Sequence, residues 1–112
     1  MKVTTDSSPF GSATRSRVLV VLHLLGDSYA RELARVLEIR LAAVQKALKS
    51  LERDRLIAGR TAGRTRLYRF DPRYFAHPEL ERYVSRLSDA EDGLRGRVAT
   101  LRRRPRRSGK PL

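Results

Sequence analysis

The chain contains no cysteine and no tryptophan, and it has only two histidines among its 112 residues. Without cysteine it can form neither disulfide bonds nor thiolate metal sites. The two histidines, His23 and His77, lie far apart in the sequence and show no metal-ligand spacing. We therefore expect no metal site and no cofactor.

Long apolar runs are also missing. The longest, Val18 to Leu25, has eight residues and includes His23, whereas a membrane-spanning helix needs about 18 or more apolar residues. Met1 and Lys2 are not followed by the apolar segment of a secretory signal. We expect a cytoplasmic protein without a membrane partner.

Positive charge, by contrast, is abundant. The 25 lysine and arginine residues outnumber 12 aspartate and glutamate residues, which gives a formal net charge of +13. Such a surplus favours a polyanionic partner, because basic side chains that contact phosphates release counterions. Nucleic acid and an anionic membrane surface both fit this charge, so motifs have to decide between them.

Hydrophobic spacing predicts three helices in the first half of the chain. The first begins after a cap at Ser12 or Thr14 and ends near Leu25. The second begins near Tyr29, and the third covers about Leu41 to Arg53. This order is typical of the three-helix core of DNA-binding proteins, whose third helix enters the major groove.

The junction between the second and third helices is ambiguous. Their apolar positions follow one helical phase, so a single helix from about Tyr29 to Arg55 is possible. Glu38, Ile39 and Arg40 include no glycine, proline, serine or threonine to end a helix or cap the next. We expect a turn here, because Ile39 would lie on the polar side of a continuous helix. An uncapped helix well beyond about 25 residues would also be unusual in a small globular chain.

A β-hairpin and a further helix are expected in the second half. The basic turn Arg60-Thr61-Ala62-Gly63-Arg64 separates two short strand-forming runs, and Asp71-Pro72 ends the second. Pro78 then starts a helix. Its seam positions follow alternating steps of three and four, with Glu91 at one of them and Gly93 and Gly96 interrupting the helix. This spacing predicts a dimerisation seam formed by Leu80, Val84, Leu87, Leu94, Val98 and Leu101. We favour homodimerisation over packing within one chain, because a three-helix core with a hairpin leaves this seam little intramolecular surface.

The expected fold is therefore mainly α-helical with a small β-hairpin: a winged helix-turn-helix, with a three-helix core and a wing, followed by a C-terminal helix. The expected organisation is a flexible N-terminal arm at residues 1–9, the winged helix-turn-helix domain at 10–76, the C-terminal helix at 77–101 and a disordered basic tail at 102–112.

The outer face of the third helix is basic and contains no acid. Small residues at its leading end allow close approach to DNA, and Gln45 and Lys46 are candidate readers of base edges. An ordinary solvated face fits the same pattern, but the arginines of the neighbouring hairpin favour DNA binding. The predicted DNA contacts are Arg40, Ala42, Ala43, Gln45, Lys46, Lys49, Arg53, Arg60, Arg64 and Arg66.

Four segments together have a family pattern: FGSATRSRVL at residues 10–19, YARELAR at 29–35, AVQKALKSLE at 43–52 and the run from Leu56 to Arg69. They resemble the opening, second helix, recognition helix and wing of ArsR-like winged helix-turn-helix transcriptional regulators. The closest similarity is to the type often joined to, or encoded beside, a nucleotidyltransferase domain. This resemblance implies a DNA-binding regulator.

The chain departs from that family at three places. Family members usually have glycine near Glu38 and serine or threonine near Arg40, and often glycine where this chain has Arg55. The metal box of the metal-sensing branch, rich in cysteine and histidine, is absent. Metal sensing is therefore not expected.

Catalysis is not expected either. Gly11-Ser12 is similar to the start of a nucleotidyltransferase signature, but that chemistry needs clustered carboxylates to hold divalent metal. Only Asp27, Glu32 and Glu38 follow within the next 30 residues, and no two of them form an Asp-x-Asp or Asp-x-Glu pair.

We expect a homodimeric transcriptional regulator that binds specific sequences in double-stranded DNA. Two other functions remain open. The chain can be a protein-interaction partner subunit of a separate nucleotidyltransferase, or a non-specific nucleic-acid binder that uses its basic tail for affinity without sequence information.

Overall fold

The computed structural model describes residues 9–103, which form five helices and three strands. In chain order these are α1 (Ala13–Leu25), β1 (Ser28–Tyr29), α2 (Ala30–Leu37), α3 (Leu41–Arg53), β2 (Ile57–Ala62), β3 (Thr65–Phe70), α4 (His77–Asp89) and α5 (Asp92–Arg103). This is the predicted winged helix-turn-helix. Most of the expected arm and tail, residues 1–8 and 104–112, lies outside the described residues.

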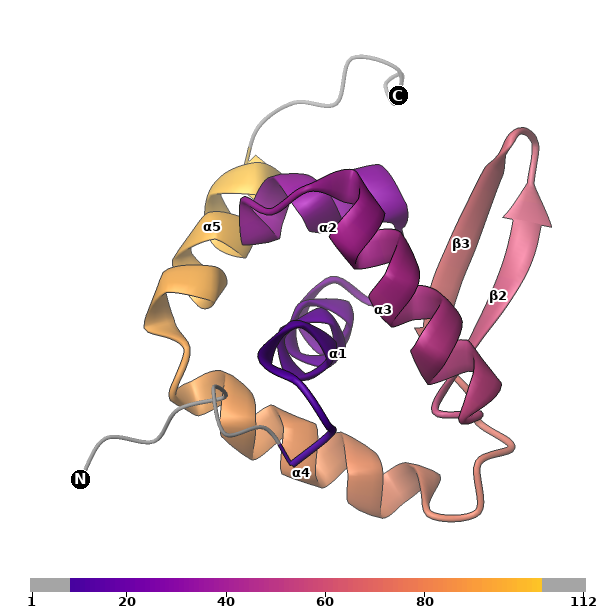
Figure 1. Ribbon diagram of the computed structural model, residues 1–112. Helices are drawn as coiled ribbons and strands as arrows, with labels where there is room; N and C mark the ends of the chain where they lie inside the picture. The colour runs from indigo at the N-terminus through magenta and orange to yellow at the C-terminus, as the bar shows by residue number, and fades with distance from the viewer. Residues whose placement is uncertain (1–8, 104–112) are drawn as a thin grey trace.

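Helix α1 forms the centre of the fold. Figure 1 looks along α1 and shows the other four helices around it, and α1 contacts all four. A helix that neighbours cover on every side has to be apolar on every side, which explains the buried run Val18–Leu22. Ser12 caps the helix by accepting a 3.1 Å hydrogen bond from the Arg15 amide, and Gly26 ends it at φ +87°.

The turn between α2 and α3 is present, so the continuous helix is excluded. Glu38 adopts the left-handed conformation (φ 58°, ψ 44°) and redirects the chain without a glycine. Arg97 of α5 donates a 2.7 Å hydrogen bond to the Val36 carbonyl, and its second terminal nitrogen lies 3.4 Å from the Glu38 carboxylate. Ile39 packs against the core. The C-terminal part of the chain therefore helps to hold this turn.

The three strands form one antiparallel sheet in the order β1-β3-β2. The expected hairpin pairs Ile57 with Phe70 and Ala62 with Thr65, and Gly63 at φ +65° supplies the turn. Strand β1, which the sequence analysis did not predict, adds Ser28 and Tyr29 to the far side of β3. The hairpin projects beyond α3 as a wing (Figure 1).

The C-terminal region differs from the prediction. Two helices replace the expected single one, because the chain turns at Ala90 and Glu91 between α4 and α5. Helix α5 also runs through Arg103, so the expected tail at 102–112 begins too early. The Arg102 guanidinium donates to the carbonyls of Leu24 and Leu25 and caps the end of α1.

The predicted dimerisation seam is buried inside this chain. Five of its residues are between 0% and 8% exposed, and the sixth packs against the same core while partly buried: Leu80, Val84, Leu87, Leu94, Val98 and Leu101. The turn at 90–91 allows α4 and α5 to cover different sides of α1. The premise that the seam lacked an intramolecular surface was therefore wrong. Within residues 9–103, no helix is both long and apolar enough to cross a membrane.

Candidate nucleic-acid interface

Helix α3 presents the outward face that its sequence predicts. The residues directed to the core are buried: Val44, Ala47, Leu48 and Leu51. The residues predicted to contact DNA are exposed: Arg40 just before the helix, then Ala42, Ala43, Gln45, Lys46, Lys49 and Arg53. The acids Glu52 and Asp54 lie at the C-terminal end of this helix, so its N-terminal half presents only neutral and basic side chains.

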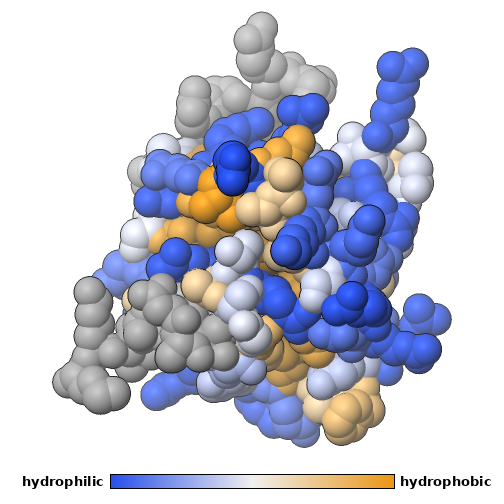
Figure 2. Space-filling model, viewed as in Figure 1, coloured by the Kyte–Doolittle hydropathy of each residue, from blue (hydrophilic) through white to orange (hydrophobic). Residues whose placement is uncertain are grey.

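Helix α3 and the wing meet at a shallow hollow of about 280 Å³. Gln45 of α3 and Arg64 at the wing tip both line it, so two elements bring predicted DNA contacts together. Arg31 of α2 and Tyr29 of β1 also line this hollow, and the sequence analysis missed both. Hydrophilic side chains cover the wing in Figure 2 and extend beyond its tip.

The predicted basic contacts fall into two groups. Four have no carboxylate partner among residues 9–103, which leaves their charges available to phosphates: Arg40, Lys46, Lys49 and Arg64. The other three are each paired within the chain. Arg53 lies 3.8 Å from Asp54, Arg60 lies 3.2 Å from Asp27 and Arg66 lies 2.6 Å from Glu52.

Arg66 connects the wing to α3. Its guanidinium passes over Gly59 of β2, where an added Cβ would meet the Arg66 Nε at 2.6 Å. It then reaches the Glu52 carboxylate of α3 and lies 5.7 Å from the centre of the Tyr68 ring. The hydrogen bond and the charge of Glu52 raise the pKa of Arg66 above its ordinary value. We call this contact between Arg66 and Glu52 the wing latch.

Among residues 9–103, no three histidine, cysteine, aspartate or glutamate side chains come together to hold a metal ion. The described face carries positively charged guanidinium and ammonium groups and one amide side chain, all of which can form hydrogen bonds. These are the groups that proteins use to contact the phosphates and base edges of nucleic acid.

No protein-family model matches the chain, and no curated protein matches it by sequence. Solved structures do share its fold. A double mutant of Lactococcus lactis ZitR superposes with a TM-score of 0.61 and 25% identity, covering 80% of this chain and 62% of the ZitR chain. The adhesin competence repressor AdcR from Streptococcus pyogenes superposes with a TM-score of 0.61 and 19% identity, covering 87% of this chain and 72% of AdcR.

This chain thus spans less than two thirds of that ZitR chain. The structural similarity supports the winged helix-turn-helix fold but does not single out the ArsR-like subtype. The described residues have the fold of winged helix-turn-helix regulators.

Proposed function

We propose that this protein binds specific sequences in double-stranded DNA and regulates transcription, as the resemblance to ArsR-like regulators implies. The observation that carries the proposal is the exposed face of α3, which is free of acid over its N-terminal half and lies beside a wing whose Arg64 has no carboxylate partner among residues 9–103. AdcR, which shares this fold, is a repressor, and the solved structures that support the fold are regulators rather than enzymes.

In this proposal α3 enters the major groove, which is wide enough for a helix. Gln45, which lines the hollow, and its exposed neighbour Lys46 contact base edges through their long side chains. Ala42 and Ala43 allow the helix to approach closely. Arg40 and Lys49 contact phosphates, which fix the register of the helix on the duplex.

The wing contacts the backbone or the minor groove chiefly through Arg64. Arg60 and Arg66 contribute less to this contact than the sequence suggested, because each is paired with a carboxylate of the same chain. DNA binding through them requires those pairs to open or to accept a phosphate beside the carboxylate.

We further propose that the protein acts as a homodimer, because two copies can read two half-sites about 34–36 Å apart along the duplex. The copies have to meet through a surface other than the seam of α4 and α5, whose residues are buried in each chain. The protein is expected in the compartment that holds its DNA, in line with the cytoplasmic location that the sequence predicts.

A footprint combined with a matched pair of charge reversals tests this function. Lys49→Glu on α3 and Arg86→Glu on α4 change the charge equally, and both residues are exposed. The proposal expects a protected palindrome for the unmodified chain, its loss with Lys49→Glu and its retention with Arg86→Glu. Uniform protection of any duplex, or equal losses in both variants, would indicate non-specific binding governed by net charge.

A further inference from the structure

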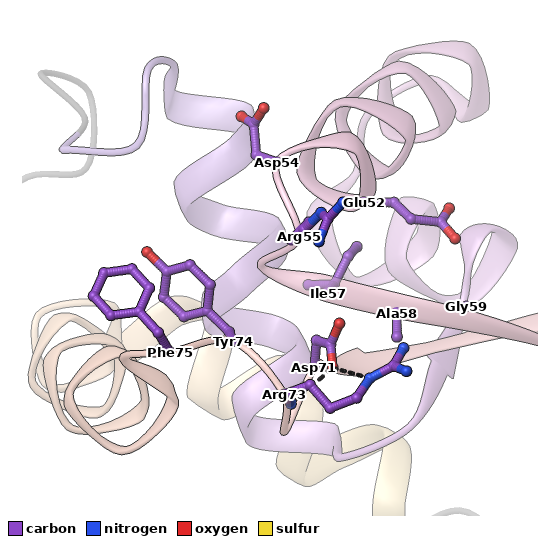
Figure 3. A pocket seen from close by; sticks show the side chains of 10 residues that line it. All are labelled: Glu52, Asp54, Arg55, Ile57, Ala58, Gly59, Asp71, Arg73, Tyr74 and Phe75. Carbon is purple, nitrogen blue, oxygen red and sulfur yellow. Dashed lines mark hydrogen bonds and ion pairs between the residues drawn. The ribbon is translucent and has the colours of Figure 1, made fainter.

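A second hollow, of about 770 Å³, lies behind the wing and shares no lining residue with the DNA-facing hollow. Figure 3 shows its boundaries: the C-terminal end of α3, the first half of β2 and the segment from Asp71 to Phe75. We call it the rear groove. None of the residues predicted to contact DNA lines it.

One side of the rear groove is formed by β2, an edge strand of the sheet. Within the three-stranded sheet β2 has one neighbour, β3, and its first residues Ile57, Ala58 and Gly59 line the groove. Alternate residues of a strand in an antiparallel pair direct their backbone groups away from the partner strand. These groups can pair with an additional extended segment, which is how many proteins bind peptides.

The other side of the groove is aromatic. Phe75 is 90% exposed, and its ring lies 5.0 Å from the ring of Tyr74, which packs against the core. Both rings stand at one end of the groove in Figure 3. Phe75 therefore offers an apolar surface in the same groove as the first residues of β2.

The charge of the groove is positive once the ion pairs within the chain are considered. Three carboxylates line it, and each lies 2.6, 2.9 or 3.5 Å from an arginine: Glu52 from Arg66, Asp54 from Arg15 and Asp71 from Arg73. Arg55 also lines the groove and is exposed, and it has no carboxylate partner among residues 9–103. The groove thus complements an acidic side chain.

The backbone at Arg55 supports a role for its side chain. Arg55 adopts a positive φ of 68°, a conformation that glycine adopts readily and that other residues adopt rarely. Glycine would adopt the backbone conformation of this turn at lower steric cost. An arginine in a conformation that disfavours it points to a function outside the fold.

We propose that the rear groove binds an extended, acidic peptide segment of another protein. The segment pairs with the open edge of β2, places an apolar side chain against Phe75 and places a carboxylate on Arg55. A nucleic-acid backbone fits the groove less well, because it offers no apolar side chain for the exposed Phe75 and no backbone amide for the edge of β2. This interaction goes beyond DNA binding and does not depend on it.

The proposal can be tested with a labelled synthetic peptide in which glutamate alternates with valine around one central phenylalanine. Fluorescence polarisation gives its affinity for the full chain. Amide NMR spectra show where it binds. The proposal expects saturable binding with shifts concentrated in β2 and residues 71–75. The same peptide with lysine in place of glutamate, or with a central proline that cannot pair, is expected to bind at least about tenfold more weakly.

Two substitutions in the groove and one outside it complete the test. Arg55→Gly and Phe75→Ser are each expected to weaken peptide binding by about tenfold or more, while Arg86→Ala removes an equivalent exposed charge on α4 and leaves it unchanged. Arg55→Gly removes the steric cost of a positive φ at residue 55 and is therefore expected to raise the melting temperature. A loss of peptide binding in a more stable variant cannot be due to unfolding.

Several results would overturn the proposal. These are absence of binding at millimolar peptide, equal binding of the lysine peptide, or shifts confined to the exposed face of α3. Weaker DNA binding by Arg55→Gly without any peptide binding would assign Arg55 to the nucleic-acid backbone instead. Because the DNA experiments use Lys49 and the peptide experiments use Arg55, failure of one function is distinguishable from failure of the other.

Discussion

Arg66 of the wing and Glu52 of α3 form a 2.6 Å ion pair whose guanidinium crosses β2 directly over Gly59. Because the pair is exposed to solvent, it contributes little to the stability of the fold. It links the wing to α3, and its path over β2 is open because residue 59 has no side chain.

The first prediction tests this wing latch with Gly59→Ala. The added Cβ meets the end of a flexible side chain rather than backbone, so the fold is retained while Arg66 is displaced from Glu52. A double-mutant cycle of Arg66→Ala and Glu52→Ala, measured by chemical denaturation, should show coupling in the native chain and none in the G59A background. Equal coupling in both backgrounds would show that Gly59 is not needed for the latch.

A second prediction concerns the left-handed backbone at Arg55. Arg55→Gly should stabilise the protein by about 0.5–1 kcal/mol, because glycine tolerates a positive φ without steric cost. This should raise the melting temperature by a few degrees. Arg55→Ala is the control, since it removes the charge and keeps the Cβ. A similar rise for alanine would attribute the gain to charge rather than to conformation.

The third prediction tests whether the seam of α4 and α5 belongs to the core of one chain or to a dimer interface. Leu94→Ala should destabilise the chain by about 2–5 kcal/mol, because it leaves a cavity beneath α5, and Thr100→Ala on the exposed face of the same helix should change little. The loss in melting temperature should be the same at low and high protein concentration, with an unchanged oligomeric state by sedimentation. Dissociation of a dimer into folded monomers would contradict the burial of this seam within one chain.

The fourth prediction compares two arginines of the wing. Arg64→Ala should weaken binding to all duplexes alike and lower the slope of log affinity against log salt by about 1, because Arg64 has no carboxylate partner in the described part of the chain. Arg60→Ala should change that slope less, because Asp27 already neutralises Arg60 at 3.2 Å. Equal effects at both positions, measured across a salt titration, would mean that the ion pair opens freely on DNA.

Local patterns were sufficient to predict α1, α3, the hairpin and the exposed face of α3, because each depends on spacing and caps within a short segment. Strand β1 was not predictable in this way: two residues become a strand only by pairing with Tyr68 and Leu67 of β3. The same holds for the wing arginines. Their sequence neighbours do not reveal that Arg60 and Arg66 have carboxylate partners 33 and 14 residues away.

Two positions at which ArsR-like regulators often have glycine keep the backbone conformation that glycine favours. Glu38 and Arg55 stand where family members often have glycine, and these two are the non-glycine residues with positive φ in the described chain. The backbone conformation is therefore retained although the residue that favours it is absent. Arg97 compensates at Glu38, and no ion pair does so at Arg55 within residues 9–103.

The C-terminal seam shows a further limit of periodicity. Alternating steps of three and four describe any apolar helix face, whether it packs on another chain or on its own. Two features decide that this face packs within its own chain. The chain turns at Ala90 and Glu91, and the apolar surface of α1 is covered by α4 and α5.

The most direct test of sequence-specific DNA binding is selection of bound duplexes from a random pool at physiological salt, with the native chain and with Gln45→Ala in parallel. The account predicts that the native chain enriches a palindromic motif. The variant should lose preference at one base pair of each half-site, a change of about 1–3 kcal/mol there. Recovery of no motif by the native chain, or of an identical motif by both proteins, would contradict the proposed role of α3.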